Sequence, residues 1–471
     1  MPPSYRKDQR RINQICFAGF LFVVLLFSCM PEDEIVTNRR GVELSFSTDT
    51  VFFDTLFTDT RSTTRVLRVF NTNANAVDVS LRVGRGERSP FLLKVNGREG
   101  KAVEGIRVFG EDSLFVFLEA TIPANPIDSI FQVKDSLIVT VNENKQDVKL
   151  VSWAENPVRF QQALIATDTL FTATRPYLIR DSLEVAEGTT LRVEAGSRLI
   201  FARDAFLRVR GQLTVEGTAE QPVFFLNERS DPPFNNTPGL WEGIILENST
   251  ANKLNHAVIR NASTGVFISR VDADSVADLT MNNSIIENMS AIGLLSLSAD
   301  VQATNTLIDN CAQRLVFIGE RGTVRFTHCT LANATNDFFR EDPSVVFTDQ
   351  VFVNENPFLS EALNVTMENS ILWGTEEEEL AFAIGNNAQS TLTLQNNIIR
   401  SGLQEGGGSI QLSDNIFNEN PEFVNPFEFD YRLDSLSPAV NSARPLGIPT
   451  DLRDSLRDET PDIGAYEYDQ D

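Results

Sequence analysis

The sequence is poor in the side chains on which much acid-base and metal chemistry depends. Its 471 residues include two histidines, four cysteines and seven lysines. Basic residues number 40 against 65 acidic ones, so the net charge is -25. A chain with this charge repels nucleic acid unless a local basic groove overrides it, and the sequence contains no such groove. We therefore expect no nucleic-acid partner.

The composition is that of a folded, water-exposed protein. Hydrophobic residues make up 42% and charged residues 22%, which excludes both an intrinsically disordered chain and a polytopic membrane protein. At 471 residues the chain is too long for one ordinary compact domain. We expect two or three units, or one elongated repeat architecture.

The first 28 residues have the pattern of a secretory signal peptide. Four basic residues among the first eleven precede an apolar run from Ile15 to Phe27, which is too short to span a membrane as a helix. The run ends in "LLFSC", which resembles the lipobox of bacterial lipoproteins and implies that Cys29 is the acylated first residue of the mature chain. Acyl chains hold such a protein to outer-membrane lipid without a spanning segment. The alternative is an ordinary cleaved signal with an incidental cysteine.

Residues 29–41 are predicted to form an acidic tether. The segment "MPEDE" begins directly after Cys29 and resembles the export signal that sends Bacteroidetes lipoproteins to the outer face of the outer membrane. An acidic run of this kind is also typical of a solvated linker. The prediction is an outer-membrane protein that is lipid-anchored and faces the cell exterior.

Residues 42–156 alternate between apolar and polar positions. Segments such as "TRVLRVF", "AVDVSLRV" and "SLFVFLEA" are separated by turn-forming stretches such as "NTNANA". This period of two favours short antiparallel strands with one buried face each, and therefore a β-sandwich. The arrangement resembles the immunoglobulin-like domains of bacterial surface proteins. We expect residues 157–176 to be a linker and a cap.

From residue 177 to 435 the pattern becomes that of a repeat scaffold. The segments "HAVIRN", "NSIIEN", "NTLIDN" and "HCTLAN" share one shape, and they end at Asn261, Asn288, Asn310 and Asn333. A return every 22 to 27 residues between these positions is the mark of a solenoid of short strands. Residues 337–362 lengthen one step, either as a coil with a degenerate turn or as an excursion from a corner.

A known family carries this pattern. The stretch "VEAGSRLIF" and the later "LRVRGQLTVEGTAEQPVFF", followed by the asparagine-containing coils, resemble right-handed parallel β-helix proteins of the pectin-lyase-like superfamily. The resemblance implies an all-β chain with about ten coils, and residues 436–471 are similar to a C-terminal capping module. It does not define the chemistry, because lyases, hydrolases, epimerases, adhesins and inert stalks share the scaffold.

The recurring asparagines are interpreted as structural. Each follows a short strand and precedes another, where a tight corner needs a left-handed backbone that Asn tolerates well. Its amide can bond to the copy one coil away, which predicts a ladder of Asn261, Asn288, Asn310 and Asn333. Gly374 occupies the same position in a later coil, as this interpretation requires.

The repeat region is poor in catalytic groups. Enzymes of this scaffold that cleave polyuronates by β-elimination need a base and usually Ca²⁺ held by acids, yet Lys253 is the only lysine in the region. His256 and His328 stand where Asn283 and Asn305 stand in other repeats, so we interpret them as polar corner residues. The paired aspartates and Gly-His-Gly of the polygalacturonase relatives are absent. We predict no catalytic residue, no cofactor and no metal site.

Two acid-rich segments and two cysteines are assigned no chemistry. The run Glu376–Glu379 is interpreted as a solvated loop. Near the C-terminus, four aspartates match no calcium-loop spacing and have arginines among them as partners: Asp451, Asp454, Asp458 and Asp462. Cys311 and Cys329 form either a disulfide or two buried thiols.

Two functional hypotheses remain. In the first, a non-catalytic surface lipoprotein presents the β-helix to a polysaccharide or a surface protein, since repeat scaffolds offer long faces for many weak contacts. Trp373 interrupts a regular turn and, of Trp241 and Trp373, is the candidate for a binding face; the alternative is burial, which is more common for large aromatic side chains. In the second, a polysaccharide-degrading lyase or glycoside hydrolase has its site beside the 337–362 excursion.

Overall fold

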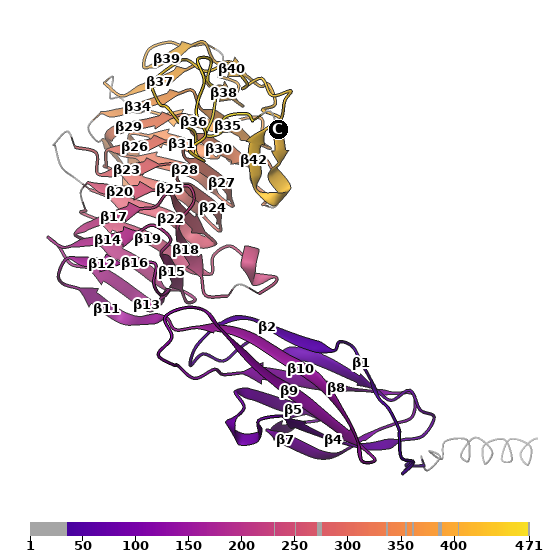
Figure 1. Cartoon of the computed structure of the whole chain (residues 1–471). Coiled ribbons are helices and arrows are strands. Elements are labelled where there is room, and N and C mark those ends of the chain that lie inside the picture. Colours follow the sequence, from indigo (N-terminus) through magenta and orange to yellow (C-terminus); the bar gives the residue numbers. More distant parts are fainter. Residues whose placement is uncertain are drawn as a thin grey trace, which may run out of the picture. The chain divides into compact units, whose positions relative to one another are not determined.

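The computed structural model describes residues 35–469 apart from 230, 250, 271–275, 336–337, 354–355, 360–361, 385–388 and 404. The predicted signal peptide (1–28) and the lipidation site Cys29 lie outside the described residues. The chain divides into two units, with the boundary between Glu155 and Asn156. Figure 1 shows both units. Apart from three short 3-10 helices, η1 (Gly86–Arg88), η2 (Phe234–Asn236) and η3 (Pro426–Glu428), every regular element described is a strand. The predicted all-β fold is confirmed.

The first unit is a β-sandwich of two five-stranded sheets. One sheet has the order β1 (Ser45–Phe46), β3 (Arg65–Phe70), β8 (Ser113–Ala120), β5 (Phe91–Val95) and β6 (Arg98–Gly100). The other has the order β2 (Thr50–Phe57), β10 (Asn144–Glu155), β9 (Phe131–Val141), β4 (Val77–Val83) and β7 (Ala102–Val108). Alternate residues of these strands, such as Leu67 and Val116, form a shared core. The second sheet is mixed, because β2 and β10 pair in parallel.

The second unit is a parallel β-helix, as predicted. One of its sheets contributes ten strands, one to a coil: β12 (Thr169–Phe171), β14 (Thr190–Glu194), β17 (Gln212–Glu216), β20 (Asn252–Asn255), β23 (Leu279–Asn282), β26 (Val301–Thr304), β29 (Gly322–Thr327), β34 (Leu363–Glu368), β37 (Thr391–Gln395) and β39 (Ile410–Ser413). These strands pair in parallel from one end to the other (Figure 1). The predicted number of about ten coils is therefore right.

The remaining strands of the helix form an eighteen-stranded sheet that wraps two faces. It begins with β11 (Val158–Ile165) and β13 (Tyr177–Val185). One face then carries β15 (Arg198–Phe201), β18 (Val223–Asn227), β21 (Ala257–Arg260), β24 (Ile285–Met289), β27 (Leu307–Cys311), β30 (Thr330–Asn333), β35 (Ile371–Gly374), β38 (Ile398–Ile399) and β40 (Ile416–Phe417). The other carries β16 (Phe206–Val209), β19 (Trp241–Glu247), β22 (Ala262–Ser269), β25 (Ile292–Leu297), β28 (Arg314–Gly319), β31 (Val345–Thr348) and β36 (Leu380–Ala383). Inward aliphatic side chains of all three faces form one continuous core.

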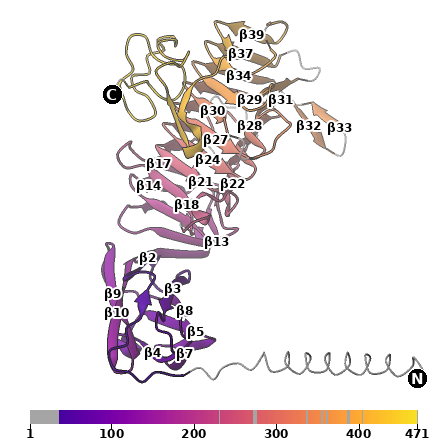
Figure 2. The ribbon, with the colours of Figure 1, turned by 90° about the vertical axis from the view of Figure 1, so that its right-hand side faces the viewer.

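One segment differs from the prediction, and a second combines two structures that were predicted as alternatives. Residues 157–176, expected as a linker and cap, form the first coil, because β11 pairs in parallel with β13 and β12 pairs with β14. The 337–362 segment is both of the predicted alternatives. Its strand β31 pairs with β28 and β36 as a coil strand does, and the hairpin of β32 (Gln350–Val353) and β33 (Asn356–Leu359) then projects from the helix (Figure 2).

The predicted asparagine ladder is present at the corner that directly follows β21 and that falls near the ends of β24 and β27. Asn261, Asn288 and Asn310 have φ values of 61°, 65° and 49°. Asn288 Nδ2 donates to Asn261 Oδ1 at 2.7 Å, and Asn310 Nδ2 donates to Asn288 Oδ1 at 2.9 Å. The amides therefore satisfy one another from coil to coil in a place that water does not reach.

The ladder ends one coil earlier than predicted. Asn333 is not among the left-handed residues; it is the last residue of β30, and its side chain exchanges hydrogen bonds with the backbone of Cys311. Thr335 takes its place and donates to Asn310 Oδ1 at 3.2 Å. Gly374 does pair with Asn333 as predicted, but it is not left-handed either. A β-carbon there would lie 1.8 Å from a carboxylate oxygen of Glu379, so the position needs glycine for space.

Left-handed residues recur at a second corner, which lies between the ten-stranded sheet and the face of β21. Seven residues before that face have a left-handed backbone: His256, Asn283, Asn305, His328, Asn369, Asn396 and Asp414. Histidine shares with asparagine an enrichment in this conformation. The prediction that both histidines are polar corner residues agrees with these backbone angles.

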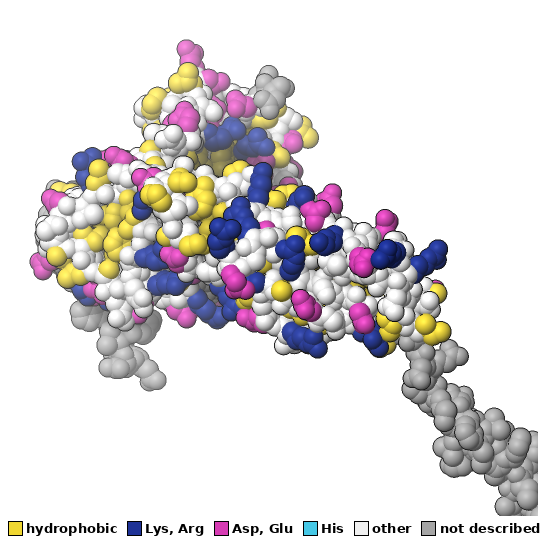
Figure 3. Space-filling view, turned by 60° about the horizontal axis from the view of Figure 1, so that its bottom comes forward, with side chains coloured by type: hydrophobic (Ala, Val, Ile, Leu, Met, Phe, Trp, Pro, Cys, Tyr) yellow, Lys and Arg dark blue, Asp and Glu magenta, His cyan; other side chains and the backbone are white. Residues whose placement is uncertain are grey.

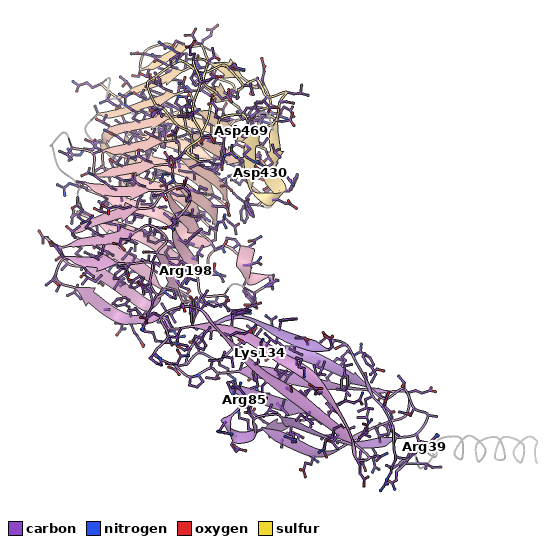
Figure 4. The ribbon with its side chains drawn as sticks, in the orientation of Figure 1. Arg39, Arg85, Lys134, Arg198, Asp430 and Asp469 are labelled. Atoms are coloured by element: carbon purple, nitrogen blue, oxygen red, sulfur yellow. The ribbon has the colours of Figure 1, made fainter. Side chains whose placement is uncertain are left out.

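The C-terminal residues 436–469 attach to this second corner. Asn283, Asn305, Asn369 and Asn396 donate to backbone carbonyls of this segment at 2.7 to 3.0 Å, namely those of Asp451, Thr450, Arg444 and Ser442. Figures 1 and 2 both place it along the side of the helix, and Figure 4 labels Asp430 and Asp469 there. The predicted capping module thus covers a side, together with the hairpin of β41 (Phe423–Asn425) and β42 (Asp430–Leu433).

The ladder generates a prediction about Asn288. We expect Asn288→Ala to lower the free energy of unfolding by about 2–4 kcal/mol, because alanine is strained in the left-handed region and two buried amides lose a partner. Asn288→Gly keeps the backbone relaxed and loses only the amide, so its loss should be about 1–3 kcal/mol. Urea unfolding followed by circular dichroism measures both. Equal stability of the alanine variant and the wild type would contradict the structural role.

Candidate binding hollow

An outward row of side chains runs along the face of β21, β24, β27, β30 and β35. Its members are aligned by strand pairing: Arg260, Glu287, Asp309, Ala332 and Trp373. Arg400 directly follows Ile399, the partner of Leu372, and so comes next in the row. We call this set the outer row. Its middle lies under the C-terminal segment, and its Trp373 end borders a hollow.

The hollow has a volume of about 580 Å³ and is lined mainly by polar groups: Trp373, Glu377, Glu378, Arg400, Gly402, Asn418 and Asn420. The Arg400 guanidinium carbon lies 5.1 Å from the centre of the Trp373 ring system. Such stacking attracts a cation to the aromatic face. Arg400 forms no ion pair with any residue that the structure describes, so its N–H donors are available to a ligand.

The exposure of Trp373 differs from the prediction. The side chain borders the hollow, but it is 8% exposed, because Arg400 covers its ring and Ile398, Leu433 and Ile463 pack beside it. Trp241 is buried as well, stacked on Phe201 with ring centroids 4.1 Å apart. Trp373 therefore positions Arg400, and the guanidinium is the group that a ligand would meet.

The four consecutive glutamates do not form one solvated loop. Glu377 and Glu378 are exposed, and Glu378 accepts hydrogen bonds from Ser401 Oγ and from Gly402 N–H, the latter at 2.8 Å. Glu379 is instead completely buried, where it forms a two-pronged ion pair with Arg340 at 2.8 and 3.0 Å. The missing β-carbon of Gly374 provides its space. No pattern in the sequence separates Glu379 from its neighbours.

The same ion pair bears on the enzyme hypothesis. Arg340 lies in the 337–362 segment, and Glu379, beyond the end of that segment, is the acid with which it pairs. Their side chains are 5% and 0% exposed, and each satisfies the other's charge. They stabilise the base of the excursion and are not available to a substrate.

Two further acids of the outer row are sealed under the C-terminal segment. Glu287 is paired with Arg260 at 2.9 Å. Asp309 is fully buried, and neither of its carboxylate oxygens has a hydrogen-bond partner among the described residues. Burial raises the pKa of Asp309 well above its usual range, and the neighbouring Glu287 charge adds to this rise. Burial also raises the pKa of Glu287, against the effect of Arg260.

The histidines serve the second corner. His328 accepts a hydrogen bond from Asn369 Nδ2 at Nε2 (2.9 Å), and its Nδ1 lies 3.2 Å from the carbonyl oxygen of Asp462. Both contacts require a neutral ring with its proton on Nδ1. Burial lowers the pKa of His328 to about 3, helped by the charge of Arg457. His256 lies 3.4 Å from Asp454, and burial lowers its pKa too. Neither ring reaches the hollow.

The remaining predicted groups are structural. Cys311 and Cys329 are free, buried thiols, and burial raises the pKa of Cys329 to about 12. Asp451 accepts from the backbone N–H groups of Arg453, Ser455 and Glu467, which fixes a turn. Within the described part of the chain, no three His, Cys, Asp or Glu side chains are grouped so as to hold a metal ion. In the same ranges, no helix is long and apolar enough to span a membrane.

Comparison with known proteins adds little. No family model matches the chain, and no curated protein is similar to it. A catalytic unit of a GH87 α-1,3-glucanase from Streptomyces thermodiastaticus is similar over 75% of this chain and 90% of its own, with 11% identity and a TM-score of 0.25. The Escherichia coli chaperone DraB matches 26% of this chain and 56% of its own, with 14% identity and a TM-score of 0.18.

A family 123 glycoside hydrolase from Clostridium perfringens shares 11% identity over 26% of this chain and 30% of its own, with a TM-score of 0.18. This chain therefore spans less than two thirds of the chaperone and of this hydrolase. Similarities this small assign no activity to this chain.

Asp309 generates a prediction about pH. Its folded-state pKa is raised, so the folded chain keeps a proton that the unfolded chain releases near pH 4. Stability is then greatest below about pH 4 for this group and is lost, by up to about 1.4 kcal/mol per pH unit, as the pH rises toward the folded-state pKa. We expect Asp309→Asn to be more stable than the wild type at pH 8, with a smaller advantage at pH 5.

Urea unfolding at the two pH values measures the effect. Asp342→Asn is a matched control, because that side chain is 76% exposed, and it should leave the pH dependence unchanged. An Asp309→Asn variant with the pH profile of the wild type would show that Asp309 is ionised in the folded state.

Proposed function

We propose that this chain is a lipid-anchored protein of the bacterial outer surface that binds a neutral glycan in the hollow beside Trp373 and does not cleave it. The observation that carries the proposal is the Arg400 guanidinium, which has no ion-pair partner among the described residues and is held over the Trp373 ring, with Glu377, Asn418 and Asn420 around it. Donors and acceptors of this kind suit sugar hydroxyls, which both donate and accept hydrogen bonds.

The charges of the hollow favour an uncharged ligand. One arginine faces two exposed carboxylates, Glu377 and Glu378, and the whole chain has a charge of -25. A polyanion would be repelled from this surface. A neutral polysaccharide meets no such barrier and can extend along the surface beyond the hollow.

Several contacts argue for binding rather than cleavage. Hydrolysis by two carboxylates requires both to reach the sugar, at a separation of about 5–10 Å. Glu378 is held by Ser401 and Gly402, and the other closely placed acids of the outer row, Glu287 and Asp309, are buried under the C-terminal segment. Among the residues that line the hollow, Glu377 therefore has no second carboxylate beside it that is both exposed and free of other hydrogen bonds.

The anchor and the sandwich complete the proposal. An acyl group on Cys29, resembling that of Bacteroidetes lipoproteins, would hold the chain to outer-membrane lipid, and the acidic tether would send it to the outer face. The sandwich, an immunoglobulin-like spacer in this proposal, separates the β-helix from the anchor along the chain. This arrangement would present the hollow to glycans outside the cell.

The first test is a binding measurement. The detergent-solubilised full chain is titrated by calorimetry with hexasaccharides of neutral glucans, mannans, xylans and galactans. We expect binding to at least one, and an increase in Kd of about tenfold or more in Arg400→Gln, because a charge-assisted hydrogen bond contributes about 1.5–3 kcal/mol. Arg192→Gln is the matched control, since Arg192 is an exposed arginine of the ten-stranded sheet, paired with Glu216. It should bind as the wild type does.

The same samples are assayed for release of reducing ends and for unsaturated products. Binding without release supports the proposal. Release that disappears in Glu377→Gln would overturn its non-catalytic part and establish a hydrolase at this hollow. Absence of binding to every sugar would overturn the proposal itself.

The anchor has its own test. Cells expressing the full chain and fed a radiolabelled fatty acid should label the wild type and not Cys29→Ser, and Cys29→Ser should leave the membrane fraction. Cys311→Ser, which replaces a buried thiol, should label like the wild type. Equal labelling of Cys29→Ser and wild type would show that no acyl group is attached at Cys29.

A further inference from the structure

The sandwich carries an apolar surface on a sheet face where water-facing side chains are normally polar. Strand β8 lies in the middle of its sheet, and its outward residues Phe115 and Phe117 are 47% and 40% exposed. Val66 of β3 lies directly opposite Phe117 and is 50% exposed. We call these three residues the aromatic face. A contiguous apolar surface with aromatic residues at its centre is typical of a binding site.

An arginine is held rigidly at the edge of this face. The Arg68 guanidinium carbon lies 4.9 Å from the ring centre of Phe70 and 5.1 Å from that of Phe115, and Nη2 donates to Ser113 Oγ at 3.1 Å. Arg68 has no ion-pair partner among the described residues. The rings fix its position without neutralising it, so its other N–H groups remain available at a defined place.

Two hollows flank Phe115. The first, of about 490 Å³, is lined by Arg68, Phe70, Asn71, Thr72, Glu111, Asp112 and Ser113. The second, of about 580 Å³, contains both rings of the aromatic face together with Lys94, Asn96, Arg107 and Phe109. Both volumes fall within the range of about 300–1,000 Å³ that small-molecule sites occupy. A flat apolar face alone would not provide such hollows.

The charges around the face select the kind of ligand. Arg68 and Glu111 line the same hollow without an ion pair to each other, while Lys94 is paired with Glu119 and Arg107 with Asp78. Figure 3 also shows basic and acidic side chains intermixed over much of the surface that it draws. Asp112 lines both hollows and likewise has no ion-pair partner among the described residues, so the free charges are one arginine against two carboxylates, a small negative excess that disfavours an anionic ligand. Such a site suits an uncharged ligand whose groups can accept from a guanidinium and donate to a carboxylate.

We infer that the aromatic face is a second carbohydrate site, which binds a neutral oligosaccharide with one sugar ring against Phe117 and the side of Phe115 that Arg68 leaves exposed, and with neighbouring sugars in the two hollows. The C–H face of a pyranose is apolar and covers an aromatic ring, while its hydroxyls point outward to the polar rim. A protein partner is a poorer fit, because a stable interface buries about 800 Å² per partner against a continuous surface, and the two hollows interrupt this one.

The inference goes beyond the hollow beside Trp373, because it concerns another unit and other residues.

The experiment uses the full chain in detergent and the same neutral hexasaccharides, with four variants. Phe115→Ala combined with Phe117→Ala should abolish one of two binding events or raise its Kd by about tenfold or more, and Arg68→Gln should weaken the same event. Phe52→Ala is the matched control: it removes a phenylalanine that is 66% exposed on the other sheet and should change nothing. Arg400→Gln should affect only the other event.

Each possible result either supports or overturns the inference. Loss in the Phe115/Phe117 variant and in Arg68→Gln, with Phe52→Ala unchanged and melting temperatures preserved, supports the inference. Binding of every sugar unchanged in both variants, or a single binding event that only Arg400→Gln weakens, overturns it and leaves the proposed function standing. If only the aromatic-face variants lose binding, the proposed hollow fails and this site stands. Should the double variant unfold, Arg68→Gln alone decides.

Discussion

The β-helix depends on one constraint, which is that each coil must turn sharply at its corners without leaving backbone or amide groups unsatisfied. Residues with a left-handed backbone solve the geometric half at two corners. Apart from Asp414 in the last coil, they are asparagine or histidine, for example Asn288 and His328. Their side chains solve the other half. At the first corner the amides bond to one another from coil to coil, and the parallel strands between corners then stack in a fixed register.

The second corner shows that the same device can serve a different purpose. There, Asn305 still bonds to Asn283, but most side chains also turn outward to the backbone of the C-terminal segment. Polar side chains that repeat every coil become a series of attachment points, and the segment covers Leu307 and Ala332 with Leu452, Ala465 and Tyr466. One consequence is chemical. The covered part of the outer row loses its access to water, which raises the pKa of Asp309 and leaves the Trp373 end open to a ligand.

Much of the fold could be predicted because its causes are local. The repeat of apolar strands and the asparagine after each of them specify the coil, the corner and the number of coils without any long-range information. Predictions failed where a distant contact decides the outcome. Asn283 and Asp451 are 168 residues apart in sequence, so nothing near either residue indicates that the C-terminal segment follows a side of the helix. Residues 157–176 looked like a linker because the partners of β11 and β12 lie outside that segment.

The candidate site was predictable only in part, for the same reason. Trp373 was found because it interrupts a turn, but its burial depends on Arg400 in the next coil. Glu379 resembles the three glutamates before it, and only the position of Arg340 makes it a core residue. The aromatic face was not predicted because alternating phenylalanines in a strand normally face a core. The sequence does not show which of two alternating sets points inward: Leu114 and Val116, or Phe115 and Phe117.

The attachment of the C-terminal segment also restricts how this chain can change its length. Solenoids ordinarily gain and lose repeats easily, since each coil touches only its neighbours. Here the segment reaches from Asn283 to Asn396 and meets successive coils at fixed residues. Inserting one coil between them would shift the later attachment points by about 4.8 Å relative to the earlier ones. Duplication or deletion of a repeat in this region would therefore need a matching change in the C-terminal segment, and growth is easier in the coils before residue 256.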